Sequence, residues 1–153
     1  MRPAVSVMVS LLAVLAFPVP ARAATHHPPP QAVAYAWATA QKGKPFAWGG
    51  RGPYAYDCSG LVYAAYRHAG ITLPRDTYSM IRSRQLERIP RAEARRGDLA
   101  FYGPPSAPEH VALVDTATVV FSAYRPGQPA GWSRDSRWWS PDAFFRVRVR
   151  GGI

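Results

Sequence analysis

The apolar residues of this chain change their spacing once, near Gly97, and this change limits the fold more than any other feature. Before Gly97 the apolar residues recur at helical intervals, whereas after it they alternate with polar residues at a period of two, which is typical of strands. Helices followed by a run of strands indicate an α+β domain, in which N-terminal helices pack on an antiparallel β-meander. The chain has 153 residues, enough for one such domain but not for two.

Three helices are expected in the first part of the chain. The first covers residues 31–42, and the second covers residues 58–69, where Asp57 is a good N-cap and Gly70 a good stop. The third is a short helix over residues 77–85. The expected strands are Leu99–Tyr102, Val111–Val114, Val119–Ala123 and Phe144–Val149.

The N-terminal residues have the pattern of a secretory signal peptide. Arg2 precedes the apolar run Ala4–Phe17, which is followed by the small-x-small sequence Ala21-Arg22-Ala23. This run is shorter than the roughly 20 residues that a membrane-spanning helix needs, so no stable membrane anchor is expected. We expect residues 1–23 to be a signal peptide, residues 24–30 a proline-rich linker and residues 31–153 the domain of a secreted or cell-envelope protein.

The chain is strongly basic. It has 19 Lys and Arg residues against 9 Asp and Glu, a net charge of +10. Loss of Arg2 and Arg22 with the signal peptide removes two charges and leaves +8. The basic residues are scattered and do not interleave with aromatic ones, so nucleic acid is not an expected partner. An anionic cell-wall polymer is a partner that this charge fits.

Cys58 is the one cysteine of the chain, which excludes an internal disulfide. The second helix is predicted to begin there, and the free amides and positive dipole of a helix N-terminus stabilise a thiolate. We therefore expect the thiol pKa to lie below its free value of about 8.5. The amides of Cys58 and Ser59 would also stabilise a developing oxyanion. A buried, inert cysteine is the alternative interpretation.

A nucleophilic thiolate needs a base, and His110 is the candidate. It stands at the start of the strand 111–114, where a strand end can hold its side chain beside a groove. Ser122 is the only polar residue of the strand 119–123 and would lie near His110 if the two strands pair. It could then orient the imidazole as a third catalytic residue. A strand-end histidine and a cross-strand serine without a role are the alternatives.

Five motifs, in this order along about residues 31–125, resemble those of the NlpC-type cysteine peptidases, papain-like endopeptidases of bacterial cell walls. The motifs are Lys44–Gly50, Asp57–Val62, Gly70–Arg75, Arg96–Phe101 and His110–Leu113. The resemblance implies Cys58 as nucleophile, His110 as base and Ser122 at a third catalytic position that is usually His, Asn or Gln. It also implies a substrate groove near Asp57, Ser59, Arg75 and Trp48. As a helix cap, Asp57 is expected to turn toward the amides and away from the sulfur, which would leave its carboxylate free to meet a substrate ammonium.

The resemblance further implies a reaction. Related enzymes commonly cleave the bond between γ-D-glutamyl and a diamino acid in peptidoglycan stem peptides, and no metal or organic cofactor is implied. One alternative is another reaction on the same scaffold, that of an N-acetylmuramoyl amidase or an acyltransferase. The other is a catalytically weak wall-binding module, which Ser122 and Phe46 (where Tyr is usual) would favour.

Overall fold

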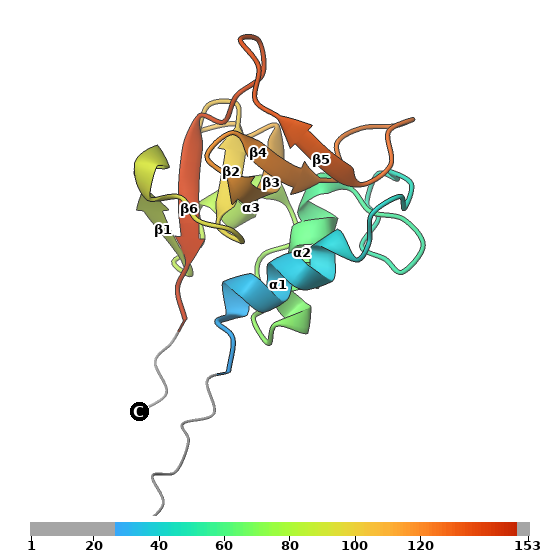
Figure 1. Cartoon of the computed structure of the whole chain (residues 1–153), viewed down its shortest axis with the longest axis horizontal. Helices are drawn as coiled ribbons and strands as arrows, with labels where there is room; N and C mark the ends of the chain where they lie inside the picture. Colours follow the sequence, from blue (N-terminus) through green and yellow to red (C-terminus); the bar gives the residue numbers. More distant parts are fainter. Residues whose placement is uncertain (1–26, 150–153) are drawn as a thin grey trace, which may run out of the picture.

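The computed structural model describes residues 27–149 and has the expected α+β architecture (Figure 1). The expected signal peptide, residues 1–23, lies outside the described residues. The helices are α1 (Pro30–Thr39), α2 (Cys58–His68), α3 (Thr77–Ile81) and the short 3-10 helix η1 (Arg91–Glu93). The strands are β1 (Leu86–Ile89), β2 (Leu99–Tyr102), β3 (His110–Thr116), β4 (Val119–Ser122), β5 (Gly131–Arg134) and β6 (Ala143–Val147).

The six strands form one antiparallel sheet in the order β1-β6-β2-β3-β4-β5. The strands β2, β3 and β4 lie in chain order, as expected for a meander, and β5 follows them. The last predicted strand, β6, does not continue the meander but returns to lie between β1 and β2. The sequence analysis missed the two edge strands, β1 and β5. Each has four residues, and three of the four β5 residues are exposed, so β5 carries no apolar alternation that the sequence could reveal.

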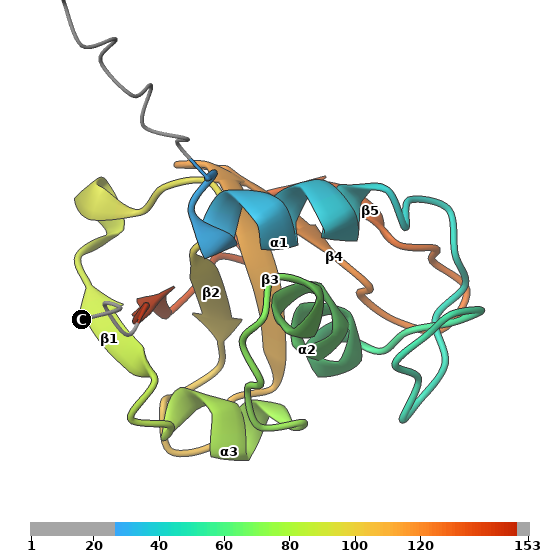
Figure 2. The same ribbon diagram turned by 90° about the horizontal axis from the view of Figure 1, so that it is seen from below.

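The helices α1 and α2 lie side by side over one face of the sheet, with α2 next to β3 (Figure 2). Asp57 caps α2 as predicted, because its side chain accepts a hydrogen bond from the Gly60 amide at 2.7 Å. Gly70 follows the helix with a φ of 83°, a left-handed conformation that favours glycine. The third helix ends at Ile81, four residues before the predicted Gln85. No helix among residues 27–149 is both long and apolar enough to cross a membrane.

The two faces of the sheet bury different sets of side chains. The face toward the helices contributes Leu99, Phe101, Val111, Leu113 and Phe121 to the main core, where Cys58 packs at the margin. The opposite face carries a second cluster that includes Ala100, Tyr102, Ala112, Val114, Val120 and Phe144. Because strand side chains alternate between the faces, His110 is expected on the side of Ala112 and Val114.

The strand predicted over Phe144–Val149 is observed as β6, which ends at Val147. Arg146 in this strand donates to both oxygens of Asp98, at 3.0 and 2.7 Å. Asp98 is 1% exposed, so its charge needs a partner inside the protein. This ion pair ties β6 to the turn that precedes β2.

Candidate active site

Cys58 is the first residue of α2 and is partly exposed. Burial raises the pKa of its thiol, and the negative charge of Asp57 raises it further. The backbone amides of Val111, Ser59 and Cys58 face the sulfur and act in the opposite direction, as a helix N-terminus should. Burial outweighs them, so the expected lowering of the thiol pKa is wrong for this structure.

His110 is the first residue of β3 and is 4% exposed. Burial alone lowers the pKa of its imidazole from 6.5 to about 4, because the charged form loses its hydration. Its ring is surrounded by aromatic side chains, with ring centres 5.3 Å away at Tyr102, 5.3 Å at Tyr124 and 6.1 Å at Trp139. The imidazole is therefore neutral at pH 7 and sits in an apolar enclosure.

The backbone at the start of β3 lies against the Cys58 thiol. The Val111 amide that faces the Cys58 sulfur belongs to the residue directly after His110. Within residues 27–149, however, no hydrogen bond joins the two side chains. Because the pKa of the thiol is raised and that of the imidazole is lowered, both groups are neutral here and do not form an ion pair.

Ser122 is the last residue of β4 and is 3% exposed. The pairing of Leu113 with Phe121 aligns β4 with β3, so Ser122 lies toward the end of the sheet that carries His110, as predicted. The hydrogen bonds of the described part of the chain include none from the Ser122 hydroxyl to the imidazole. The strands bring the two residues together without the bond that would orient His110.

Asp57 is held inside a dense hydrogen-bond network. Its Oδ1 accepts from the Gly60 amide at 2.7 Å, from Arg75 at 3.0 Å and from the Ser59 hydroxyl at 3.3 Å. Its Oδ2 accepts from the Gly49 amide at 2.8 Å and from Arg75 at 3.0 Å. The carboxylate is 8% exposed and paired with a guanidinium, so in this structure it is not free to meet a substrate ammonium, contrary to the expectation.

The other predicted substrate-binding residues differ in their surroundings. Arg75 joins the network from the loop after α2, donating to the Ser59 hydroxyl at 2.9 Å and to the Gly50 carbonyl at 3.0 Å. Trp48 stands outside it, 80% exposed, with its ring edge-on to Phe46 at 4.9 Å. Of the four, Trp48 is the one whose side chain is open to solvent.

Sequence reasoning missed the aromatic neighbours of His110. Tyr102 pairs directly with His110 across β2 and β3, so a correct register would have found it. Tyr124 follows β4, and Trp139 lies in the segment between β5 and β6. The single available signal for Trp139 was its aromatic side chain, which does not specify a partner.

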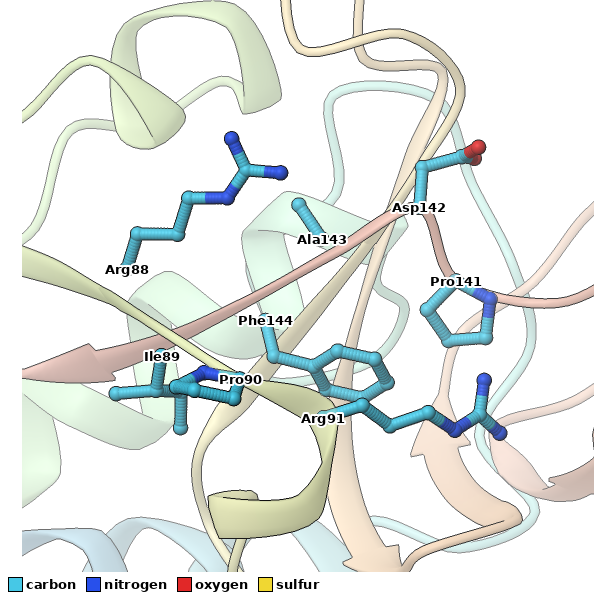
Figure 3. A pocket seen from close by; sticks show the side chains of 8 residues that line it. All are labelled: Arg88, Ile89, Pro90, Arg91, Pro141, Asp142, Ala143 and Phe144. Carbon is cyan, nitrogen blue, oxygen red and sulfur yellow. The ribbon is translucent and has the colours of Figure 1, made fainter.

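The larger cavities lie away from Cys58. One of about 590 Å³ opens between the end of β1 and the start of β6 (Figure 3). It is lined by Arg88, Ile89, Pro90, Arg91, Pro141, Asp142, Ala143 and Phe144. A smaller one of about 320 Å³ borders the His110 enclosure through Tyr102, Glu109 and Trp139. Within residues 27–149 no group of three or more metal-ligating side chains gathers at either place.

Comparisons with known proteins identify the family to which this chain is similar. The NlpC/P60 family model matches residues 43–139. The peptidoglycan endopeptidase RipB of Mycobacterium tuberculosis is 41% identical over 92 residues, which are 50% of this chain and 36% of RipB. The murein DD-endopeptidase MepH of Escherichia coli is 45% identical over 64 residues, 40% of this chain and 24% of MepH. The chain thus spans well under half the length of these curated relatives.

Solved structures agree with the fold. The solved structure of RipB has a TM-score of 0.67 at 26% identity, and the match covers 78% of this chain and 66% of the RipB chain in that structure. RipD of M. tuberculosis, described as a non-catalytic NlpC/p60 domain protein adapted to peptidoglycan binding, has a TM-score of 0.64 at 29% identity. That match covers 81% of this chain and all of the RipD chain (100%). The family model covers more than half of the sequence. The chain therefore belongs, as the order of its motifs implied, to the NlpC/P60 family, a family of cysteine hydrolases.

Proposed function

We propose that this chain is a secreted cysteine endopeptidase that hydrolyses peptidoglycan stem peptides, with Cys58 as nucleophile and His110 as base. The observation that carries the proposal is the set of backbone amides that face the Cys58 sulfur, those of Cys58, Ser59 and Val111, the last of which directly follows His110 in β3. Amides in this arrangement stabilise first a thiolate and then an oxyanion. The similarity to RipB, a peptidoglycan endopeptidase, and to MepH, a murein DD-endopeptidase, supports the same substrate class.

The proposed reaction has an acylation step and a hydrolysis step. The Cys58 thiol transfers its proton to His110 as its sulfur attacks the scissile carbonyl, and the amides of Cys58 and Ser59 hold the oxyanion. His110 then protonates the leaving amine, which departs and leaves a thioester on Cys58. Water, activated by His110, hydrolyses the thioester and restores the thiol. Because both groups are neutral at rest, proton transfer accompanies the attack.

We further propose that the scissile bond joins γ-D-glutamyl to a diamino acid. The name of MepH points to a different bond, between two D-configured centres in cross-linked peptides. Two substrates distinguish these reactions. An uncross-linked disaccharide tetrapeptide is cleaved within its stem by the first activity, whereas the second activity acts only on a cross-linked dimer and releases two monomers.

A wall-binding module is the second candidate, and specific observations favour it. The thiol and imidazole are both neutral, and Ser122 does not bond His110. RipD, described as non-catalytic, is one of the structural neighbours. A binding module would retain peptidoglycan in a pull-down without releasing soluble products.

The test is mass spectrometry of the two defined muropeptides and of whole peptidoglycan after incubation with the purified mature protein. We expect a glutamyl-terminated product from wild type and none from Cys58→Ala, which keeps the fold but lacks the sulfur. Cleavage at the lactyl amide would instead identify an amidase, and a product extended by an added amine would identify an acyltransferase. Unchanged substrates with retained binding would establish the binding module.

We also propose export, with the mature chain beginning at about Ala24 and carrying a charge of +8. N-terminal sequencing of the protein from culture supernatant tests the cleavage site, and an intact Met1 on intracellular protein would contradict it. The positive charge would hold the enzyme on anionic wall polymers, an attraction that salt screens. Release from purified walls should therefore increase with salt concentration.

A further inference from the structure

The imidazole of His110 is enclosed by aromatic rings from three separate segments. Tyr102 comes from β2, Tyr124 from the loop after β4, and Trp139 from the segment between β5 and β6. The Tyr124 ring is nearly perpendicular to the imidazole, at 83°, and the Tyr102 ring is tilted by 58°. Such perpendicular and tilted contacts are favourable aromatic geometries.

Trp139 is the residue that joins these rings into one unit. Its indole stacks on Tyr102 at 4.8 Å and 13°, contacts Tyr124 at 5.3 Å and lies 6.1 Å from His110. It is partly buried against the second core cluster. The neighbouring Trp138 is 85% exposed and packs only with Arg137 among the aromatic contacts described, so the two tryptophans have different tasks.

The segment that carries Trp139 is fixed at both ends. A backbone bridge joins Ser136 to Trp139, with hydrogen bonds of 2.9 and 3.3 Å. At one end Asp135 pairs with Arg91, and its amide donates to the Thr118 carbonyl at 2.8 Å. At the other end Asp142 accepts a hydrogen bond from the Gly103 amide at 2.8 Å. The indole is thus held on the ring cluster by the sheet itself.

We propose that Trp139 is a positioning residue for His110, closing an aromatic enclosure that fixes the imidazole where a polar third residue would otherwise orient it. This inference rests on the proposed function, because positioning matters only if His110 acts as the base. Ser122 lies nearby but does not bond the imidazole, which leaves the ring contacts to define its plane. The enclosure also leaves His110 only 4% exposed, and this burial keeps the imidazole neutral at pH 7.

Apart from the aromatic enclosure, few titratable or charged groups lie where they could control the protonation of His110. The Cys58 sulfur faces the Val111 amide at the start of β3, and burial raises the pKa of the Tyr102 hydroxyl, so this hydroxyl is neutral at pH 7. The Asp135–Arg91 pair lies beyond Tyr102, and Glu109 beside His110 is exposed. Opening the enclosure should therefore act through hydration of His110.

The first test is an NMR titration of the His110 imidazole, assigned with His110→Gln, in the full mature chain. Wild type should titrate near 4. Trp139→Ala should raise the midpoint toward 6.5 by about one unit or more, because water reaches the ring. Trp139→Phe keeps a ring and should stay near wild type. Trp138→Ala is the matched control, since it removes an exposed tryptophan of the same segment, and should not move the midpoint.

Trp139→Leu separates positioning from mere folding, because it keeps apolar bulk but removes the ring. On a stem peptide that wild type cleaves, Trp139→Leu and Trp139→Ala should lower kcat about tenfold, with little change in KM. The acid limb of the pH profile should move in parallel with the NMR midpoint. Trp139→Phe should restore kcat, whereas a loss through unfolding would appear in circular dichroism instead.

The titration tests the enclosure and the cleavage assay tests the proposed activity, so each can fail without the other. If Trp139→Ala titrates like wild type, the enclosure does not control His110 and the inference is overturned. The same conclusion holds if Trp138→Ala shifts the midpoint equally. If the midpoints move as expected but wild type cleaves no muropeptide, the proposed endopeptidase activity fails, and Trp139 would then control the imidazole of a binding protein.

Discussion

Replacing Arg75 with alanine should damage both the stability of the fold and the reactivity of the thiol. The guanidinium makes four hydrogen bonds of 2.9 to 3.0 Å, to both oxygens of Asp57, to the Ser59 hydroxyl and to the Gly50 carbonyl. It joins the loop before α2, the first turn of α2 and the loop after it. Removing it leaves the Asp57 carboxylate without its cation.

The magnitude follows from the burial of the pair. The Asp57 side chain is 11% exposed and the Arg75 side chain 27% exposed. Removal of one partner from a fully buried pair costs about 3–5 kcal/mol. Water reaches part of the guanidinium and can replace part of its contribution, so we expect a loss of about 2–3 kcal/mol in the free energy of unfolding. The charge of Asp57 already raises the pKa of Cys58, and an unpaired carboxylate should raise it further.

Urea unfolding followed by circular dichroism measures the first effect, and the rate of iodoacetamide alkylation at about pH 8 measures the second. Arg84→Ala is the matched control, because Arg84 is exposed and lies away from Asp57. Adding Asp57→Asn to Arg75→Ala removes the orphaned charge, so the double variant should lose less stability than the two single losses combined. An Arg75→Ala protein within about 0.5 kcal/mol of wild type would refute the reasoning.

Four further predictions follow from the same structure. Because burial raises the pKa of the Cys58 thiol above 9.0, its alkylation rate should still be rising at about pH 9, and a plateau below about pH 8 would contradict this. The folded state keeps His110 neutral down to about pH 4 whereas the unfolded chain protonates it near 6.5, so this stability is present above pH 6.5 and lost as the pH falls. Between about pH 7.5 and 4, wild type should therefore lose about 3 kcal/mol more than His110→Gln in urea titrations, and equal losses would count against a buried neutral imidazole. Ser122→Ala should change kcat by less than about threefold, since no bond to His110 is lost, and a tenfold loss would identify Ser122 as the orienting residue. A methyl group at Gly60 would overlap a backbone carbonyl of the preceding loop, so Gly60→Ala should cost about 2 kcal/mol in thermal or urea unfolding, unlike Gly131→Ala, where the nearest atom is 3.7 Å away.

Local features of this protein could be predicted from the sequence because neighbouring residues determine them. The Asp57 side chain caps α2 through an amide three residues away, which places Cys58 at the first turn of the helix. The period of two in the second part of the chain likewise predicted four strands, β2, β3, β4 and β6, to within two residues at each end. The order of short motifs was sufficient to assign the family, which the family model confirmed.

Other features depend on residues distant in the sequence. Arg75, 18 positions after Asp57, pairs with its carboxylate. The capping pattern alone had predicted that this carboxylate would be free for a substrate. The return of β6 between β1 and β2 is a matter of long-range pairing, and no local pattern specifies which strand it joins. The register of β3 and β4 brought Ser122 toward His110 without fixing the side-chain bond between them.

The sequence by itself determined that a cysteine would begin a helix and that a histidine would begin a strand, because capping and periodicity act over a few residues. Only the tertiary structure decided their protonation. Burial depends on segments that fold together from across the chain, and here burial outweighs the helix N-terminus at Cys58 and leaves the imidazole of His110 neutral. Trp139 lies 29 residues after His110, so its place over the imidazole arises from the packing of the sheet and its connecting segments.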